Sequence, residues 1–404
     1  MRHPALRLYT VLFLLCAALG AGASEEPTFE ACVADLGARA AAEGIAEPIW
    51  REAVAVTAPV PRVLELDRSQ PEFTTPFSRY FGLRVSPGRI DAGRRHFREH
   101  RALLQRVQQA SGVPGHYLVA FWGLETNFGS YLGKMPLLGS LATLACDPRR
   151  ADFFGAQWID AVRLLDRGDL TFDRLESSWA GALGHVQFMP SVYLRYAQDG
   201  DGDGRVDLFG SVDDAMVSAG AFLQGLGWAR GERWGREVAL PEGFDYGLAG
   251  RKKRRSLAAW GALGIRQADG APLPAADLEA ALLVPSGHAG PAFLVYRNFD
   301  VIMGWNRSEF YALSVGILAD AIAGGAGLST APPADELRLS MDQVSALQRA
   351  LVEGGHLTGA VDGLLGPATR AALARAEAAF GLIADGHPDP HTLAVLGLDL
   401  SPQP

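Results

Sequence analysis

Residues 111–129, SGVPGHYLVAFWGLETNFG, organise this chain because they carry one carboxylate, Glu125, at the end of an apolar helix. Pro114 suits a helix start, five apolar side chains supply a buried surface, and Asn127 and Gly129 favour a helix end. Burial disfavours the charged form of a carboxyl group and raises its pKa, which makes it a proton donor near neutral pH. Glu125 is therefore a candidate general acid; the alternative is a structural Glu that pairs with an arginine and faces water.

The N-terminus has the three parts of a secretory signal peptide. Arg2 and Arg7 are basic, an apolar run covers residues 8–19, and small residues end at Ala23. This pattern predicts that residues 1–23 are a signal peptide cleaved after Ala23, which leaves an exported, soluble protein. The apolar run is too short for a membrane-spanning helix, and no later stretch has the length that a bilayer requires.

Two cysteines, Cys32 and Cys146, remain after this cleavage. Disulfides persist in exported proteins, so the two can form one. They can equally be two separate buried thiols, because the sequence does not give the distance between them. Their spacing does not match a metal site.

Composition indicates a globular protein of two domains with a mainly α fold. The chain has 404 residues, of which 48% are hydrophobic, and a net charge of -8. Its length allows a sizeable core, and its mild acidity argues against nucleic acid as a partner. Helical periodicity covers residues 30–50 and 89–110, and runs of alternating polarity are few.

A change in composition near residue 325 separates the two expected domains. Residues 324–333, GGAGLSTAPP, are small, uncharged and rich in turn formers, as linkers are. The C-terminal part then shows three short amphipathic helices, about the smallest unit that folds alone. The expected segments are a catalytic domain at 24–325, a linker at 326–338 and a small domain at 339–404.

A second informative run covers residues 177–190, SSWAGALGHVQFMP. Its small residues allow close backbone approach, Ser178 and Gln187 offer hydrogen bonds, and Trp179 and Phe188 offer flat apolar faces. Sugars present hydroxyl groups at their edges and C–H groups on their faces, so this mixture suits a saccharide. The alternative is a helix-packing contact made of Gly and Ala.

Four motifs together closely resemble the lytic murein transglycosylase B family. They are ETNFG from Glu125, SWAGALGHVQFMPS from Ser178, LATLACDPRRADFF from Leu141, and the stretch from Asn298 to Tyr311. The resemblance implies a mainly helical, goose-lysozyme-like domain in the periplasm. It also implies cleavage of the bond between N-acetylmuramic acid and N-acetylglucosamine in peptidoglycan, without water, which leaves a 1,6-anhydromuramoyl end.

The resemblance also assigns the site residues. Glu125 falls on the catalytic acid/base, Ser178 and Gln187 on substrate-contacting residues, Asn306 on the active-site Asn, and Tyr311 on a nearby aromatic residue. A retaining glycosidase normally needs a second carboxylate as nucleophile, and these motifs contain none. In the family, the N-acetyl oxygen of the substrate takes that place, so one Glu serves first as acid and then as base.

One departure from the family affects the residue before Asn306. Some members have Tyr there, whereas this chain has Trp305. The indole can stack on a sugar, but the hydrogen bond of a Tyr hydroxyl is lost.

Two other functions stay open at this point. Glu176 and Asp173 lie just before the second run and could supply the second acid of an ordinary hydrolytic muramidase. The chain could also be a catalytically silent scaffold that binds the cell wall. An acid on an apolar helix argues against a pure binder.

Residues 199–207, DGDGDGRVD, look like the first half of an EF-hand loop. Asp199, Asp201, Asp203 and the Arg205 carbonyl have the spacing of calcium ligands, but position 12 of the loop is Gly210 rather than Glu. The family contains calcium sites closed by a later acid, and Asp213 is the best match. We expect a weak structural calcium site; a metal-free Asx/Gly turn is the alternative, and catalysis requires no cofactor.

The small C-terminal unit resembles the peptidoglycan-binding domain of many wall hydrolases. Val344, Leu347, Gln348 and Leu351 match its first helix, and AVDGLLGPATRAAL at 360–373 matches its turn and second helix. The match implies that peptidoglycan strands are the partner, with Arg370 as an exposed polar contact; protein partners stay open. Few aromatic residues are available to stack on glycan, so a spacer without affinity is the alternative.

Overall fold

The computed structural model describes residues 28–69 and 75–398. The predicted signal peptide lies outside them. Within these residues the fold is mainly α, as predicted, with seventeen α-helices and two small sheets. The helices are α1 (Phe29–Ala42), α2 (Glu47–Val56), α3 (Arg62–Ser69), α4 (Phe77–Arg84), α5 (Pro87–Glu99), α6 (Arg101–Ser111), α7 (Gly115–Thr126), α8 (Leu137–Ala145), α9 (Ala151–Arg167), α10 (Pro190–Tyr196), α11 (Val212–Gly225), α12 (Leu257–Ala262), α13 (Arg297–Trp305), α14 (Glu309–Ile322), α15 (Met341–Glu353), α16 (Pro367–Ala379) and α17 (Pro390–Val395).

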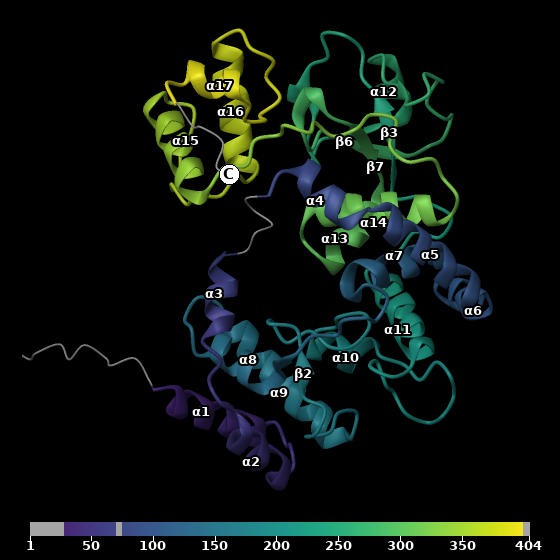
Figure 1. Ribbon diagram of the computed structural model, residues 1–404, viewed down its shortest axis with the longest axis vertical. Coiled ribbons are helices and arrows are strands. Elements are labelled where there is room, and N and C mark those ends of the chain that lie inside the picture. Colours follow the sequence, from purple (N-terminus) through teal and green to yellow (C-terminus); the bar gives the residue numbers. More distant parts are fainter. Residues whose placement is uncertain (1–27, 70–74, 399–404) are drawn as a thin grey trace, which may run out of the picture.

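Helix α7 is the buried centre of the larger unit (Figure 1). Apolar side chains stand on every side of this helix, and ten of its twelve residues are buried. A helix without a polar face must be covered on all sides, and α5, α6, α11 and α14 pack around it. His116 near its start and Glu125 near its end are the residues that stay partly exposed. The fold therefore holds Glu125 at the rim of a rigid element.

A five-stranded antiparallel sheet, which the sequence did not predict, forms between residues 235 and 295. The strands run in the order β4-β6-β7-β3-β5. Their side chains build a second core around Trp260 and Tyr296. The strands of the structure are β1 (Met135–Pro136), β2 (Glu176–Ser177), β3 (Gly235–Ala239), β4 (Arg254–Ser256), β5 (Arg266–Gln267), β6 (Glu279–Leu283) and β7 (Ala292–Val295).

A disulfide joins Cys32 on α1 to Cys146, the residue that follows α8. The two Cα atoms lie 6.0 Å apart, across 114 positions of sequence. Of the two possibilities that the sequence left open, the structure has the bridge. It ties α1 to the C-terminal end of α8.

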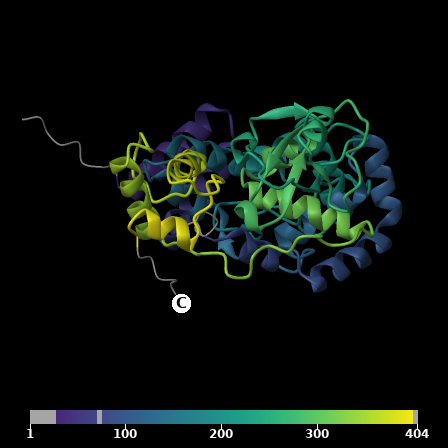
Figure 2. The same ribbon diagram turned by 90° about the horizontal axis from the view of Figure 1, so that it is seen from above.

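The C-terminal helices α15, α16 and α17 form a separate small core, which lies to one side of the larger unit in Figure 2. Gln348 is buried at its centre and binds the turn before α16: its side-chain amide donates to Asp362 and Leu364, and its oxygen accepts from the Gly363 amide. Pro367 is the first residue of α16, where its missing N–H has no consequence. The predicted first helix and turn are therefore present.

The small unit is docked on the larger one. The backbone N–H of His288 donates to Oδ2 of Asp385 at 2.6 Å, and Glu336 accepts from the Ser78 amide at 2.7 Å. Arg370 lies at this junction, where burial lowers its pKa while Glu336 and Glu309 oppose that change. The prediction that Arg370 is exposed is therefore wrong, because its side chain is partly buried at this junction.

The connection between the units lies on the surface of the larger one in both views (Figures 1 and 2). The backbone amides of Ser329 and Thr330 each donate to Glu237 of β3 at 2.7 Å. No helix in the described part of the chain is long and apolar enough to cross a membrane.

Candidate active site

Glu125 occupies the penultimate position of α7 and is half-buried. Its Oε1 atom accepts two hydrogen bonds, one from the Tyr311 hydroxyl at 2.5 Å and one from the Trp305 indole N–H at 2.9 Å. Both donors are uncharged and come from segments about 180 residues later in the chain. The carboxyl group is thus held in one orientation by neutral groups, the arrangement that a positioned acid/base requires.

Tyr311 lies on α14, in the turn that Ser308 caps. It is 5% exposed, and burial followed by the nearby Glu125 carboxylate raises its pKa well above the ordinary value. The phenol therefore stays protonated at any physiological pH. It acts as a permanent donor toward Glu125 and not as a competing base.

Trp305 ends α13 and packs among three phenylalanines. Its ring centroid lies 4.3 Å from that of Phe121, 5.2 Å from Phe222 and 5.5 Å from Phe188. This aromatic contact fixes the indole plane, so the N–H points at Glu125. The sequence suggested a lost hydrogen bond at this position, whereas the indole supplies one of its own.

The chain reverses sharply after Glu125. Asn127, Phe128 and Gly129 all have positive φ, at 49°, 60° and 79°. A Cβ atom on Gly129 would lie 2.2 Å from Cε1 of His185, so this position requires glycine for space as well as for conformation. The Thr126 hydroxyl donates to the His185 carbonyl at 2.9 Å and closes the turn.

His185 connects this turn to the second motif. The Trp122 indole donates to its Nδ1 at 3.0 Å, and burial lowers the pKa of the imidazole. A neutral ring with Nδ1 as acceptor satisfies both observations. His185 thereby fixes the loop at residues 178–190 against the helix that carries Glu125.

Ser178 and Gln187 are partly buried in this loop and bind its backbone. The Ser178 hydroxyl accepts from the Ala182 amide at 3.0 Å. The Gln187 side chain donates to the carbonyls of Gly184 at 2.9 Å and Leu132 at 3.2 Å, and its backbone has a φ of 49°. A non-glycine residue in this conformation is uncommon and frequently marks a functional site.

Asn306 follows α13 directly. Its Oδ1 accepts from the backbone amide of Ser308 at 3.0 Å, and Ser308 in turn caps the first turn of α14. Through these bonds Asn306 sets the start of the helix that carries Tyr311. Of the predicted binding residues, Tyr311 contacts Glu125 directly, and the other three shape the adjoining loops.

The two acids considered for a hydrolytic mechanism have a different environment. Glu176 is exposed on β2, which pairs with β1 through Pro136. Asp173 is exposed, and a hydrogen bond with the Thr171 side chain lowers its pKa. Neither acid is desolvated in the way that a proton donor near neutral pH requires.

In the acidic loop, Asp214 rather than the predicted Asp213 lies beside the loop carboxylates. Carboxylate oxygens of Asp199, Asp201 and Asp214 lie within 4.8 Å of one another, whereas Asp213 pairs with Arg106 at 2.9 Å. Consecutive helical residues point about 100° apart, so only one of the two acids on α11 can face the loop. Asp214 is buried and binds the amides of Gly200 and Asp207.

The remaining predicted ligands lie in the same loop. Asp203 is exposed and its Oδ1 accepts from the Arg205 amide at 2.8 Å. Gly202 and Gly204 have φ of 81° and 86°, which gives the loop its tight turns. A set of carboxylate oxygens around such turns suits a hard cation such as calcium, with Asp214 in the place expected for Asp213.

Comparison with known proteins agrees with this geometry. Residues 28–320 match the transglycosylase SLT domain family. The chain belongs to this family. Residues 340–396 match a peptidoglycan binding domain family, so the resemblance stated from the motifs is confirmed for both units.

Several relatives of this transglycosylase are characterised. Membrane-bound lytic murein transglycosylase B of Escherichia coli (strain K12) is 31% identical over 246 residues, which are 59% of this chain and 65% of that protein. The chain thus spans slightly less than two thirds of that relative. SltB3 from Pseudomonas aeruginosa, solved in complex with NAG-anhNAM-pentapeptide, is 42% identical with a TM-score of 0.87, covering 92% of this chain and 99% of SltB3.

A third relative concerns the acidic loop. The Escherichia coli lytic transglycosylase Slt35, solved in complex with calcium, has a TM-score of 0.64 and 26% identity, covering 72% of this chain and 92% of Slt35. The two Escherichia coli relatives are named as lytic transglycosylases, and the chain described here shares the fold of Slt35 and SltB3.

Proposed function

We propose that this transglycosylase cleaves the β-1,4 bond between N-acetylmuramic acid and N-acetylglucosamine and leaves a 1,6-anhydromuramoyl end. The observation that carries the proposal is the single carboxyl group of Glu125, held by the neutral donors Tyr311 and Trp305 at the end of an apolar helix. The complex of SltB3 with NAG-anhNAM-pentapeptide supports the same product.

The proposed reaction needs one carboxyl group in two roles. Protonated Glu125 first gives its proton to the glycosidic oxygen, and the N-acetyl oxygen of the muramoyl sugar attacks the anomeric carbon as that bond breaks. The Glu125 carboxylate then takes the proton of the 6-hydroxyl group, whose oxygen attacks the anomeric carbon and displaces the N-acetyl oxygen. Glu125 ends protonated again, and no water is consumed.

Tyr311 and Trp305 support the second half of this cycle. Both donate to Oε1, so they stabilise the carboxylate that forms when the glycosidic oxygen takes the proton. Ser178, Gln187 and Asn306 are proposed to bind substrate. The hydroxyl and amide groups of the first two lie in a loop with a tight backbone, which suits sugar hydroxyls and the N-acetyl group.

The experiment is digestion of purified sacculi followed by mass spectrometry of the released muropeptides. Products that end in 1,6-anhydromuramic acid are expected, and Glu125→Gln abolishes their release while leaving the protein bound to sacculi. Reducing-end muramic acid would mean that water attacks and would favour a hydrolase that uses Glu176. No release from the parent protein, with retained binding, would favour the silent scaffold.

We propose that the C-terminal unit binds peptidoglycan and that the protein acts in the periplasm after export. The family match at residues 340–396 supports the first statement, and the N-terminal pattern up to Ala23 supports the second. Pull-down of the protein with sacculi, with and without residues 339–404, tests the binding. Fractionation of expressing cells tests the location.

A structural calcium ion in the acidic loop is a further proposal. Asp199, Asp201, Asp203 and Asp214 would hold it, and a calcium ion would neutralise their mutual repulsion. The loop is linked to the active-site turn, because the His185 amide donates to the Leu208 carbonyl at 2.9 Å. The calcium complex of Slt35 supports such a site, and catalysis needs no metal chemistry.

A further inference from the structure

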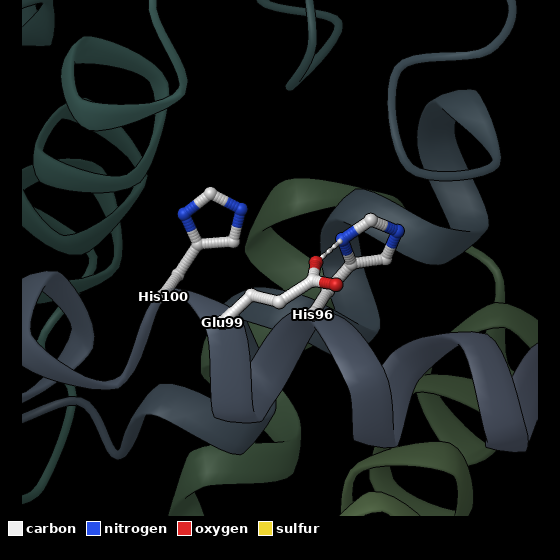
Figure 3. A group of neighbouring side chains, drawn as sticks. All are labelled: His96, Glu99 and His100. Atoms are coloured by element: carbon white, nitrogen blue, oxygen red, sulfur yellow. Dashed lines mark ion pairs between the residues drawn. The ribbon is translucent and has the colours of Figure 1, made fainter.

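Two histidines and a glutamate meet where α5 ends, in a segment that the proposed glycan chemistry does not use. The sequence at residues 96–100 is HFREH. Ligand atoms of His96, Glu99 and His100 all lie within 4.8 Å of one another. In Figure 3 the Glu99 carboxylate lies between the two imidazole rings.

We propose that His96, Glu99 and His100 bind one divalent transition-metal ion, with zinc as the preferred occupant. Two imidazole nitrogens and one carboxylate are a ligand set that zinc uses, with a water molecule in the fourth position. Calcium requires six to eight oxygen ligands and does not suit this cluster. The site is distinct from the acidic loop, which offers oxygen alone.

The backbone explains why three residues so close in sequence can converge. His96 and Glu99 stand one turn apart on α5, so their side chains share a face. His100 is the residue between α5 and α6, with φ of -97° and ψ of 21°. Its N–H still donates to the His96 carbonyl at 2.9 Å, so this side chain, four residues after His96, stays on the same face as the first two.

The imidazole rings are held before any ion arrives. The ring centroid of His96 lies 4.9 Å from those of both Trp122 and Phe128, and that of His100 lies 5.6 Å from Trp122. In the described part of the chain, the buried Nδ1 atom of His96 makes no hydrogen bond, and its ion pair with Glu99 spans 3.1 Å. A metal ion would bind this atom and the Glu99 carboxylate together.

The distances allow coordination after small side-chain rotations. Zinc–ligand bonds of about 2.1 Å in a tetrahedron place the ligand atoms about 3.4 Å apart. The His96 to Glu99 separation of 3.1 Å is already close to that value, and His100 has to approach by at most about 1.4 Å. Arg95 and Arg98 are exposed on the same helix. Their positive charges repel a cation, so we expect them to weaken the binding of the metal ion.

The cluster also adjoins the active-site turn. Phe128, which contacts His96, is the third residue after Glu125. A bound ion would therefore fix the α5–α6 junction against the end of α7. This proposal stands whether or not the proposed glycan cleavage is correct, because binding and cleavage are measured separately.

The test is a calorimetric titration of the metal-free, tag-free full chain with zinc chloride. One zinc per chain is expected, together with a rise in Tm of about 5 °C at a hundredfold excess of zinc over Kd. Cobalt(II) at the same site should show the intense visible bands of tetrahedral coordination. His100→Gln and Glu99→Gln should each weaken binding by about tenfold or more.

Three further variants make the result specific. His391→Gln removes an exposed histidine elsewhere, and Asp201→Asn removes a carboxylate of the acidic loop, so both should bind zinc like the parent. Arg95→Ala keeps all three ligands and removes a repelling charge, so it should bind more tightly. Circular dichroism of each metal-free variant checks the fold.

Several outcomes would overturn the proposal. They are the absence of saturable zinc binding, unchanged binding in His100→Gln, or loss of binding in Asp201→Asn. Weaker binding in Arg95→Ala would also contradict it. Loss of zinc binding in His100→Gln, together with tighter zinc binding in Arg95→Ala, would support the proposed site.

Discussion

The hydroxyl group of Tyr311 donates to Oε1 of Glu125 at 2.5 Å, across 186 positions of sequence. Tyr311 keeps its proton, because burial and the carboxylate beside it raise its pKa. The carboxyl group that we propose as the general acid is therefore positioned by a group that keeps its own charge unchanged.

Tyr311→Phe should lower the rate of muropeptide release by about tenfold to a hundredfold, because the carboxylate loses one of its two described donors. Stability should fall by only about 1 kcal/mol, the usual effect of one lost hydrogen bond. Tyr193→Phe is the matched control, since Tyr193 is equally buried and donates to the Val206 carbonyl. An equal loss of activity in both variants would contradict a specific role for Tyr311.

Gly129→Ala should destabilise the protein by about 2–4 kcal/mol, because the new Cβ would meet His185 at 2.2 Å in a left-handed conformation. Gly270→Ala has nearly the same φ, 84°, with no atom within 4 Å of the new Cβ. Gly270→Ala should lower the free energy of unfolding by about 1 kcal/mol, because only the left-handed backbone conformation is unfavourable for alanine there. Chemical denaturation measures both, and similar costs would mean that the close contact is unimportant.

Reduction of the disulfide between Cys32 and Cys146 should lower the free energy of unfolding by about 2–5 kcal/mol. The bridge closes a long loop and so restricts the unfolded chain. Thermal unfolding with and without a reductant measures the effect. The double variant Cys32→Ala/Cys146→Ala should unfold like the reduced parent and should not respond to reductant.

The contribution of Glu377 to the stability of the C-terminal unit should fall as pH rises from about 5 to 8. Burial raises the pKa of Glu377 from 4.5 to about 7, and one carboxylate oxygen of this group has no hydrogen bond among the described residues. Between these two pKa values the folded state binds more protons than the unfolded state, so stability falls with rising pH by up to about 3 kcal/mol.

Glu377→Gln should remove this loss. His387 contributes the opposite sign, because burial lowers its pKa to about 4 and folding then becomes more favourable as pH rises from about 4 to 6.5. Since His387 is present in both proteins, the difference between parent and variant isolates Glu377. Urea unfolding at pH 5 and pH 8 measures how the free energy of unfolding changes with pH in the parent and in Glu377→Gln. An equal change in the two proteins would refute the prediction.

Calcium should raise the Tm of the parent and of Asp213→Asn, but not that of Asp201→Asn. The reason is that Asp201 belongs to the carboxylate group of the loop, whereas Asp213 pairs with Arg106 outside it. Differential scanning calorimetry with calcium or with a chelator measures the shift. A loss of response in Asp213→Asn would restore the closing residue predicted from the sequence.

Sequence reasoning placed Glu125 at the end of an apolar helix, and the structure has it there; its catalytic role rests on the family motifs and stays a prediction. It missed the five-stranded sheet because β6 and β7 are buried on nearly every residue, so the alternation of a half-exposed strand is absent. It chose Asp213 over Asp214 because spacing alone does not give the rotation of a helix about its axis. The donor role of Trp305 depends on a contact 180 positions away, which no local pattern encodes.

Docking of the small unit has a practical consequence for dissecting this transglycosylase. Glu309 lies two residues before Tyr311. Burial raises its pKa, and Arg370 of the small unit is among the charges that oppose this rise. The backbone N–H of His288 donates to Asp385, which belongs to the same small unit. A fragment that ends at residue 325 would lack both Arg370 and Asp385, so Glu309 and His288 would lose these neighbours. Such a fragment is a perturbed enzyme, and comparing its rate with that of the full chain would measure lost support as well as lost wall binding.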